Sequence, residues 1–387
     1  MSGNLLVAHG GGPTAVINSS LAGIITTARN DPRINRVFGA RRGIEGVIAG
    51  DLVDLTELSA HDTEVLARTP GSALGSCRYK VKEEDHAAIL KTLEEHGVEV
   101  FLYNGGNDSM DTCLKVSRLT DDVGVIGIPK TIDNDLAATD HSPGFGSAAR
   151  FYAFSAVELA LDVAALDIHV SVLEVMGRNA GWLTAASDLA WEIADAGPQM
   201  VLVPEVAFDE ERFLDTVRDH WNRGRGFVIA ASEGLTGPDG TALVEEKSGA
   251  AVDAFGHALP GNVSMHLAGL IRDRLDIRAR SEKPGLIGRV SRANVSEIDR
   301  REAIDAGSFA VRAALDGETG KMVALSRVSS SPYRSEPVLV PLEDVANVER
   351  ALPGTYMDAD RFRTTPAFAE YALPLLSPPF PQYFQLH

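Results

Sequence analysis

The sequence predicts an α/β protein built from two lobes, each a parallel β-sheet flanked by helices. Three observations carry this prediction. Short apolar runs alternate with helix-like stretches along most of the chain, the length of 387 residues suits roughly two domains, and 44% of the residues are hydrophobic, enough for a sizeable core. Strands separated by helices are typical of βαβ units, whose parallel sheets are covered on both faces.

The predicted elements follow from apolar periodicity and from glycine or proline punctuation. Apolar runs predict strands at 4–8, 98–103, 123–128, 170–175, 200–203 and 227–231. Helical patterns predict helices at 16–28, 86–96 and 151–166. The Pro-Gly-Phe-Gly stretch at 143–146 is interpreted as the passage between the lobes, and the proline-rich end, 373–383, as a tail packed on the surface or at a subunit contact.

Composition excludes several classes of protein. The formal net charge is −18, which argues against nucleic acid or an anionic membrane as a partner. No apolar run of about 18 residues is present, so no membrane-spanning helix is expected, and the start of the chain lacks the layout of a signal peptide. Two cysteines, Cys77 and Cys113, are too few for a disulfide framework, which favours a reducing, cytoplasmic setting.

Two segments that follow neighbouring predicted strands carry the strongest functional signal. They are Asn-Gly-Gly-Asn-Asp-Ser at 104–109 and Pro-Lys-Thr-Ile-Asp-Asn-Asp at 129–135. Ligands in open α/β sheets bind beyond the carboxyl ends of the strands. Glycine, hydroxyl, carboxylate and lysine at two such ends indicate a place to hold a phosphate and to transfer it.

Within these segments, each polar residue type suggests a role. Asn107 and Asp108 have oxygen atoms that suit a divalent cation. If the second strand continues, alternation puts Lys130 on one side and Thr131 with Asp133 on the other. Asp133 is then placed to accept a proton from an attacking hydroxyl, while Lys130 offsets charge on the phosphoryl group. The alternative is that these acids only cap a following helix.

Two further stretches support a phosphate site. A glycine turn at 9–18 joins a predicted strand to a helix, where backbone N–H groups and the helix dipole favour an anion. The loop at 71–80 ends in Arg78 and Lys80. Each stretch alone is more commonly a plain connector or a solvated loop. The turn matches neither a Walker A lysine motif nor a dinucleotide fingerprint, which argues against a nicotinamide dehydrogenase.

The string Thr131-Ile132-Asp133-Asn134-Asp135 and the triplet Met176-Gly177-Arg178 are signature segments of the phosphofructokinase A family. The chain resembles this family, and within it the pyrophosphate-dependent branch, from the glycine turn to about Ala310. The resemblance implies two Rossmann-like lobes with parallel sheets flanked by helices and an active site in the cleft between them. It also implies Mg²⁺ as cofactor and a homodimer or homotetramer.

The resemblance further implies the role of each matching residue. Asp133 is the general base for the sugar's 1-hydroxyl, assisted by Thr131 and Arg178. Donor binding is assigned to Gly11, Gly12, Arg78, Lys80, Gly106, Asp108, Ser109 and Lys130, and the metal to Asn107 and Asp108. Sugar-phosphate binding is assigned to Thr131, Asp133, His169, Met176, Gly177, Arg178, Glu233, Arg280, Leu286 and Arg289, with Arg280 and Arg289 as the 6-phosphate clamp and one of them often supplied by a neighbouring subunit.

Donor choice is predicted at two positions. ATP-using members carry glycine at the positions of Asp108 and Lys130, which leaves room for a nucleotide. A carboxylate at 108 would obstruct and repel the nucleotide's α-phosphate, and Lys130 places a cation where the second phosphate of pyrophosphate would lie. The sequence therefore predicts pyrophosphate as the phosphoryl donor.

Three residues depart from the family pattern. Asn107 stands where many members have a magnesium-linked aspartate, Leu286 where a histidine or tyrosine touches the sugar phosphate, and His169 where an arginine reaches the adjacent subunit's sugar site. The last two concern the acceptor. The predicted reaction is reversible phosphoryl transfer from diphosphate to fructose 6-phosphate, giving fructose 1,6-bisphosphate. The alternatives are another acceptor, such as allulose 6-phosphate, or a non-catalytic sugar-phosphate sensor.

The lobes are predicted at 1–143, on the donor side, and 144–387, on the sugar-phosphate side and including the tail. The chain is expected to return to the first lobe near 289–307.

Overall fold

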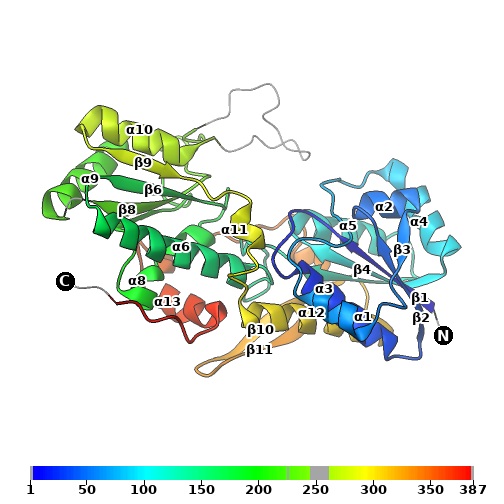
Figure 1. Cartoon of the computed structure of the whole chain (residues 1–387). Helices are drawn as coiled ribbons and strands as arrows, with labels where there is room; N and C mark the ends of the chain where they lie inside the picture. The colour runs from blue at the N-terminus through cyan, green and yellow to red at the C-terminus, as the bar shows by residue number, and fades with distance from the viewer. Residues whose placement is uncertain (1–2, 225, 245–260, 385–387) are drawn as a thin grey trace. The chain divides into compact units, whose positions relative to one another are not determined.

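The computed structural model describes residues 3–224, 226–244 and 261–384. The chain forms two compact units (Figure 1). Unit 1 comprises Met1–Ser147 and Arg289–Arg350, and unit 2 comprises Ala148–Gly288 and Ala351–His387. The α/β fold class with parallel-rich sheets flanked by helices is confirmed.

Unit 1 contains a seven-stranded sheet in the order β11-β10-β5-β4-β1-β2-β3. The pairs β2–β1, β1–β4, β4–β5 and β5–β10 are parallel, whereas β3 and β11 pair antiparallel at the edges. The strands are β1 Gly3–His9, β2 Ile34–Ala40, β3 Leu52–Asp54, β4 Val98–Gly105, β5 Gly124–Pro129, β10 Lys321–Ser330 and β11 Tyr333–Pro341.

Helices cover both faces of this sheet. One face packs on α1 (Ile17–Arg29), α3 (Ala60–Ala67) and α12 (Glu297–Leu315); the other packs on α2 (Ile44–Ala49), α4 (His86–Glu95), α5 (Asn107–Ser117) and the turn η2 (Leu342–Asp344). The strand period of two divides β1 between the faces: Leu5 and Val7 pack on the first core, Leu6 and Ala8 on the second. Helices α1 and α12 pack so closely that a Cβ at Gly23 would lie 2.2 Å from the Ile304 carbonyl oxygen.

The chain returns to unit 1 at Arg289. It remains in this unit to Arg350, because β10 adds to the sheet beside β5 and β11 folds back on β10. The pairing of β10 with β5 joins Lys321 to Ile126, residues far apart in the chain. A sequence pattern carries no direct signal of such a contact.

Unit 2 contains a four-stranded parallel sheet in the order β7-β8-β6-β9. Its strands are β6 Val170–Val175, β7 Met200–Leu202, β8 Phe227–Ser232 and β9 Ala279–Glu282, with a small ladder of β12 Met357–Asp358 and β13 Arg363–Thr364. Its helices and turns are α6 (Phe145–Ala165), α7 (Trp182–Ser187), α8 (Ala190–Ala194), α9 (Glu210–Gly224), α10 (Val263–Leu275), η3 (Gly354–Tyr356), α13 (Pro366–Ala372) and η4 (Leu373–Leu376). The short helix α11 (Ile287–Val290) contains the second boundary between the units, and η1 (Glu83–Asp85) precedes α4.

Helix α6 begins six residues before the helix predicted at 151–166, so the expected passage at 143–146 includes its first turn. The cause is Asp299 of α12, whose carboxylate accepts hydrogen bonds from the N–H groups of Gly144 (2.8 Å) and Ser147 (2.9 Å). These amides lie at the start of the helix and have no partner within it. A capping residue more than 150 positions away in the chain explains why the local pattern missed this start.

The proline-rich end packs on unit 2. Leu375 and Leu376 of η4 are buried, and Arg150 donates from Nη1 to the Leu376 carbonyl oxygen (2.5 Å). Arg150 also lies over the ring of Phe154. Among the described residues, no helix is long and apolar enough to cross a membrane.

Candidate active site

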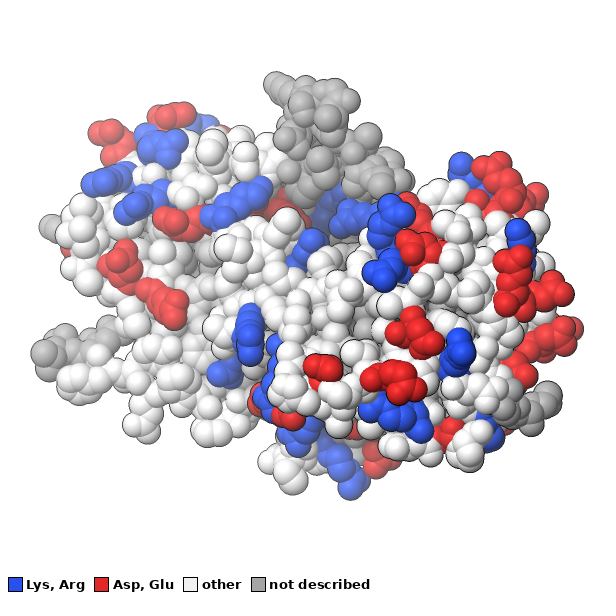
Figure 2. All heavy atoms as spheres, turned by 45° about the vertical axis from the view of Figure 1, so that its right-hand side comes forward, with Lys and Arg blue, Asp and Glu red and all other residues white. Residues whose placement is uncertain are grey.

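The carboxyl ends of β1, β4 and β5 bring the predicted donor residues together in unit 1. His9 pairs with Asn104 in register, and Gly105 pairs with Pro129. The loops that follow these strands therefore lie side by side at one edge of the sheet, the usual place for a ligand in this architecture. On the face in Figure 2, acidic and basic side chains are interspersed.

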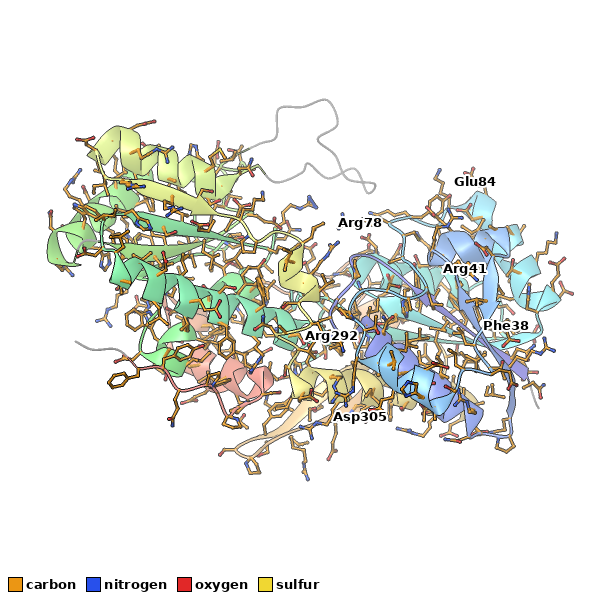
Figure 3. All side chains as sticks on the ribbon, in the orientation of Figure 1. Phe38, Arg41, Arg78, Glu84, Arg292 and Asp305 are labelled. Carbon is orange, nitrogen blue, oxygen red and sulfur yellow. The ribbon has the colours of Figure 1, made fainter. Side chains whose placement is uncertain are left out.

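The loop at 71–80 lies against the glycine turn. The Gly11 N–H donates to the Cys77 carbonyl oxygen (3.0 Å), and the Ser76 hydroxyl donates to the Gly11 carbonyl oxygen (2.6 Å). These bonds hold Ser76 and Cys77 against the glycine turn. Arg78, labelled in Figure 3, and Lys80 follow directly in the chain. Lys80 forms an ion pair with Asp108 in the first turn of α5, with Nζ 3.4 Å from the carboxylate. Two predicted donor residues are thus direct neighbours.

Lys130 lies at the centre of the donor set. It is 3% exposed, and its Nζ donates to the Gly12 carbonyl oxygen (2.7 Å). Burial, helped by the charge of Arg289, lowers its pKa to about 7, although Asp135 and Asp133 act in the opposite direction. A Cβ at Gly12 would lie 2.8 Å from Nη1 of Arg289, so glycine allows this arginine to approach the turn. Arg289, predicted as part of the sugar-phosphate clamp, thus lies among the donor residues.

The loop that carries Asp133 does not continue the strand, so the alternation at 130–133, which was expected only for a continuing strand, does not apply. Strand β5 ends at Pro129, and the Thr131 N–H donates to the Pro143 carbonyl oxygen (3.3 Å). The Asp133 N–H donates to the Thr131 hydroxyl (3.0 Å), which ties the two predicted catalytic residues together. Asn134 then adopts a left-handed φ of 55° and turns the chain. Side chains on both sides of this segment are consequently buried, Lys130 and Thr131 among them.

Oxygen atoms near the start of α5 and in the Asp133 loop suit a hard cation. The Oδ1 atoms of Asn107 and Asp135 are buried, and neither has a protein hydrogen-bond partner. Both residues lie beside the segment 348–349. Asn107 Nδ2 donates to the Val348 carbonyl oxygen (2.8 Å). Burial raises the pKa of Asp135, and the negative charge of Glu349 raises it further. The described residues contain no group of three or more His, Cys, Asp or Glu placed to hold a metal. Mg²⁺ commonly takes one or two carboxylates and completes its shell with water and substrate phosphate.

Two other predicted donor residues have different environments. Gly106 is the N-cap of α5, whose first amide groups face this edge of the sheet. Ser109 is 4% exposed, and its hydroxyl lies close to Gly10 and Gly105 and bonds to Tyr103. The Ser109 side chain therefore packs the glycine turn against β4.

In unit 2, the carboxyl ends of β6 and β8 bring four predicted sugar-site residues together. The Glu233 N–H donates to the Val175 carbonyl oxygen (2.9 Å), and the Glu233 carboxylate accepts from the Gly177 N–H (3.3 Å). Met176 is held by a bond from its N–H to the Tyr152 hydroxyl (3.2 Å). Burial raises the pKa of Glu233, with the nearby Glu174 acting in the same direction and Lys283 and Arg178 opposing it.

The sequence interpretation missed an ion pair close to this set, between the buried Glu174 and the exposed Lys283. Glu174 of β6 is 3% exposed. Its carboxylate accepts a hydrogen bond from the Ser264 N–H (2.9 Å) and lies 2.6 Å from Lys283 Nζ. The only available signal was a glutamate inside an apolar strand, where a charge needs a partner.

His169 and Arg280 lie at the other end of the same sheet. His169 immediately precedes β6, and Arg280 pairs in register with Ser171 at the amino end of that strand. Burial, followed by the charges of Arg280 and Arg278, lowers the His169 pKa. The six residues of β6 span about 20 Å. Within unit 2, these two residues are therefore separated from Met176 and Glu233, and Leu286 is 62% exposed.

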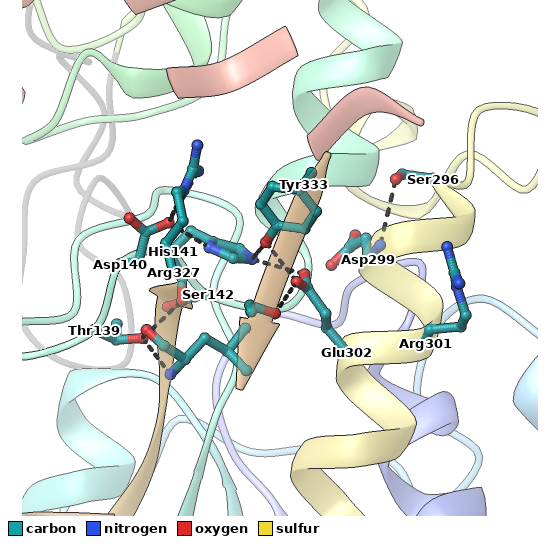
Figure 4. Close-up of polar contacts among 12 residues, drawn as sticks. Thr139, Asp140, His141, Ser142, Ser296, Asp299, Arg301, Glu302, Arg327 and Tyr333 are labelled. Atoms are coloured by element: carbon teal, nitrogen blue, oxygen red, sulfur yellow. Dashed lines mark hydrogen bonds and ion pairs between the residues drawn. The ribbon is translucent and has the colours of Figure 1, made fainter. Parts of the chain in front are cut away.

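A buried ionic cluster supports the segment between the Asp133 loop and α6 (Figure 4). His141 bonds through Nε2 to Glu302 of α12 (2.7 Å) and through Nδ1 to Asp140 (2.8 Å). Two residues of the β10–β11 hairpin complete the cluster. Arg327 donates from Nη2 to the Asp140 carboxylate (3.0 Å), and the Tyr333 hydroxyl donates to the Glu302 carboxylate (2.5 Å). Burial opposes the charge on His141, but Glu302 and Asp140 outweigh it and raise its pKa to about 9.

Replacing Glu302 by glutamine is expected to lower the free energy of unfolding by about 3 kcal/mol at pH 7, since removing one partner leaves a buried charge uncompensated. Glu297→Gln, on the exposed face of the same helix, should stay within about 0.5 kcal/mol of the wild type in urea denaturation. The His141 contribution is complete below pH 6.5 and is lost as the pH rises through about 9. The difference in the free energy of unfolding between wild type and Glu302→Gln should therefore decrease as the pH rises from 6.5 to about 9. A difference that stays constant would contradict a charged His141–Glu302 pair.

Comparison with known proteins decides the family. The profile of the family described as Phosphofructokinase matches residues 4–314. The chain belongs to the phosphofructokinase family. This confirms the family predicted from the 131–135 and 176–178 segments.

Relatives of this phosphofructokinase-family chain carry informative names. A protein of Xanthomonas campestris pv. campestris, named pyrophosphate–fructose 6-phosphate 1-phosphotransferase, is 44% identical, with 97% of this chain and 92% of that protein covered. A sulfofructose kinase of Alkalicoccus urumqiensis is 34% identical over 91% of each chain. The crystal structure of a pyrophosphate-dependent phosphofructokinase from Marinobacter aquaeolei superposes with a TM-score of 0.88 at 34% identity, covering 99% of this chain and 94% of the other.

Proposed function

We propose that this chain is a pyrophosphate-dependent phosphofructokinase that transfers a phosphoryl group reversibly from diphosphate to the 1-hydroxyl of fructose 6-phosphate. The observation that carries the proposal is Lys130, buried against Gly12 beside Arg289 and close to Asp133. A nucleotide needs open space at this position, whereas the compact, highly charged diphosphate needs a cation. The names of relatives at 38–44% identity agree with this donor and acceptor.

The unit 1 residues supply the donor side and the base. Asp133 accepts the proton of the attacking hydroxyl, and Thr131 holds the backbone N–H of Asp133. Lys130, Arg78 and Lys80 offset the charge of the diphosphate, with amide groups of the glycine turn and of α5 completing the anion site. As the sugar oxygen bonds to the transferred phosphorus, the bond from that phosphorus to the bridging oxygen of diphosphate breaks, so orthophosphate leaves while Asp133 takes the hydroxyl proton.

Mg²⁺ would be held by Asn107 and Asp108, together with Asp135, whose buried Oδ1 suits a hard cation. When bound, it would neutralise charge on the phosphoryl oxygens.

The unit 2 residues supply the acceptor side. Glu233, with its carboxylate fixed by the Gly177 N–H, is placed to bind sugar hydroxyls, and Met176 and Arg178 adjoin it. His169 and Arg280 sit at the opposite end of the sheet, so they would contribute to a sugar site only in a second copy of the chain. We therefore propose a homodimer or homotetramer. We place the enzyme in the cytoplasm, in keeping with its two free cysteines.

A pyrophosphate-driven assay over a panel of sugar phosphates tests the proposal. Fructose 6-phosphate is expected to give the highest kcat/KM, with turnover requiring Mg²⁺ and ATP giving none. The panel includes allulose 6-phosphate and 6-sulfofructose, because Leu286, one of the predicted sugar-site residues, is apolar and exposed, and one relative is a sulfofructose kinase. Turnover with ATP and none with diphosphate would overturn the assignment of diphosphate as the donor. A higher kcat/KM with another sugar phosphate would replace fructose 6-phosphate as the acceptor. No turnover with any donor and acceptor would indicate a non-catalytic sensor.

A further inference from the structure

Arg350 contacts the loop that carries Asp133 through nearly every donor it has. Its Nε and Nη2 donate to the Asn134 carbonyl oxygen (3.2 and 3.0 Å). Its Nη1 donates to the carbonyl oxygens of Thr139 (2.6 Å) and Asp140 (2.8 Å). Its backbone N–H donates to the Asp135 carbonyl oxygen (2.8 Å). One planar group therefore joins the two ends of the segment from Asn134 to Asp140.

The segment held in this way has little support from regular structure. Asn134 has a left-handed φ of 55°, a conformation that a non-glycine residue adopts at a cost. Its side chain is fixed as well, since Oδ1 accepts the Ser142 N–H (3.1 Å). Asn134 is bonded directly to Asp133, so any change in its backbone angles moves the carboxylate. Surrounding contacts must therefore maintain this conformation.

The chain around Arg350 holds the loop at further points. Leu136 forms a bridge with Glu349, next to Arg350. In β10, Leu325 accepts the Asp140 N–H (2.9 Å) and donates its own N–H to the Thr139 hydroxyl (2.9 Å). All of these contacts come from the part of the chain after residue 314, where the match to the family profile ends. They form a support for the catalytic loop that the matched domain does not itself contain.

We propose that Arg350 is a positioning residue for Asp133: its guanidinium fixes the 134–140 loop and so holds the catalytic carboxylate at the correct distance from the acceptor hydroxyl. Arginine is required, because its rigid fork reaches three carbonyl oxygens at once, whereas a lysine ammonium is a single point donor. Arg350 acts on the loop through backbone carbonyl oxygens, so it should affect kcat more than sugar-phosphate binding. The inference rests on the proposed function, because it assigns Asp133 as the base.

The first experiment compares Arg350→Met and Arg350→Lys with wild type in the pyrophosphate-driven assay. Displacing a base by about 1 Å can reduce turnover about 100-fold, so kcat is expected to fall by about that factor with Arg350→Met and nearly as much with Arg350→Lys. The KM for the sugar phosphate should change by less than about threefold. Arg334→Met, on the exposed surface of β11, is the matched control and should retain full activity. In Arg350→Ala, millimolar guanidinium should restore part of the lost kcat.

The second experiment measures loop order without relying on activity. Amide hydrogen exchange at 134–142 is expected to be faster in Arg350→Met than in wild type, with exchange in β1 and β4 unchanged. Unchanged exchange in the loop, wild-type kcat, or a loss of kcat that equals the unfolded fraction seen by near-ultraviolet circular dichroism would each overturn the positioning role. If wild type shows no turnover with diphosphate, the proposed function fails, and the exchange data still decide whether Arg350 orders the loop.

Discussion

Replacing Asp133 by asparagine is expected to lower kcat by about 10³ to 10⁴-fold, the largest effect of any single substitution in this chain. The amide retains the size of the carboxylate but cannot accept the proton of the attacking hydroxyl. The Asp133 N–H still bonds to the Thr131 hydroxyl, so the loop should keep its conformation. Steady-state kinetics with diphosphate and fructose 6-phosphate measure the change.

Asp121→Asn, in an exposed loop of unit 1, removes the same charge elsewhere and is the control. The KM values of Asp133→Asn should stay near those of wild type, because the carboxylate acts on the transition state rather than on either bound substrate. A decrease of less than about tenfold would mean that another group takes the proton, and Asp133 would lose its assignment as the base.

The second large effect is expected at Lys130. Replacing it by methionine keeps the buried volume and removes the cation beside Gly12, so kcat/KM for diphosphate should fall by about 10² to 10³-fold, as when one charge-stabilising donor is removed from other active sites. The KM for the sugar phosphate should change little, since the Glu233 set lies in unit 2. Equal losses for both substrates would contradict a role confined to the donor.

The pH profile provides an independent check on Lys130. Its pKa is lowered to about 7, so the ammonium form that attracts the donor is present below that pH and is lost as the pH rises through it. The kcat/KM for diphosphate reports the free enzyme and is expected to decrease above pH 7. Dividing the wild-type profile by that of Lys130→Met cancels the titration of diphosphate itself, so a ratio that does not fall with pH would contradict this assignment.

Local sequence patterns predicted most of the regular structure. Apolar runs located β1, β4, β5 and β6 to within two residues, because a buried parallel strand needs a continuous apolar segment. The glycine turn and the polar strand ends were also identified, since parallel sheets place their ligands there. The start of α6 was placed six residues too late, because Asp299 binds its first turn from a distance in the chain.

The sequence by itself determined the α/β class and the family, and it proposed the residues of phosphoryl transfer, above all Asp133, Lys130 and Asp108. Those conclusions depend on residue type and short spacing, which the chain displays directly. Only the tertiary structure decided how the catalytic loop is held. Arg350 lies 216 positions from Asn134, and Glu302 lies 161 from His141. Such contacts depend on which strands pair and on where a buried charge meets its partner. Both become favourable only in the folded chain, so no local segment of the sequence reveals them.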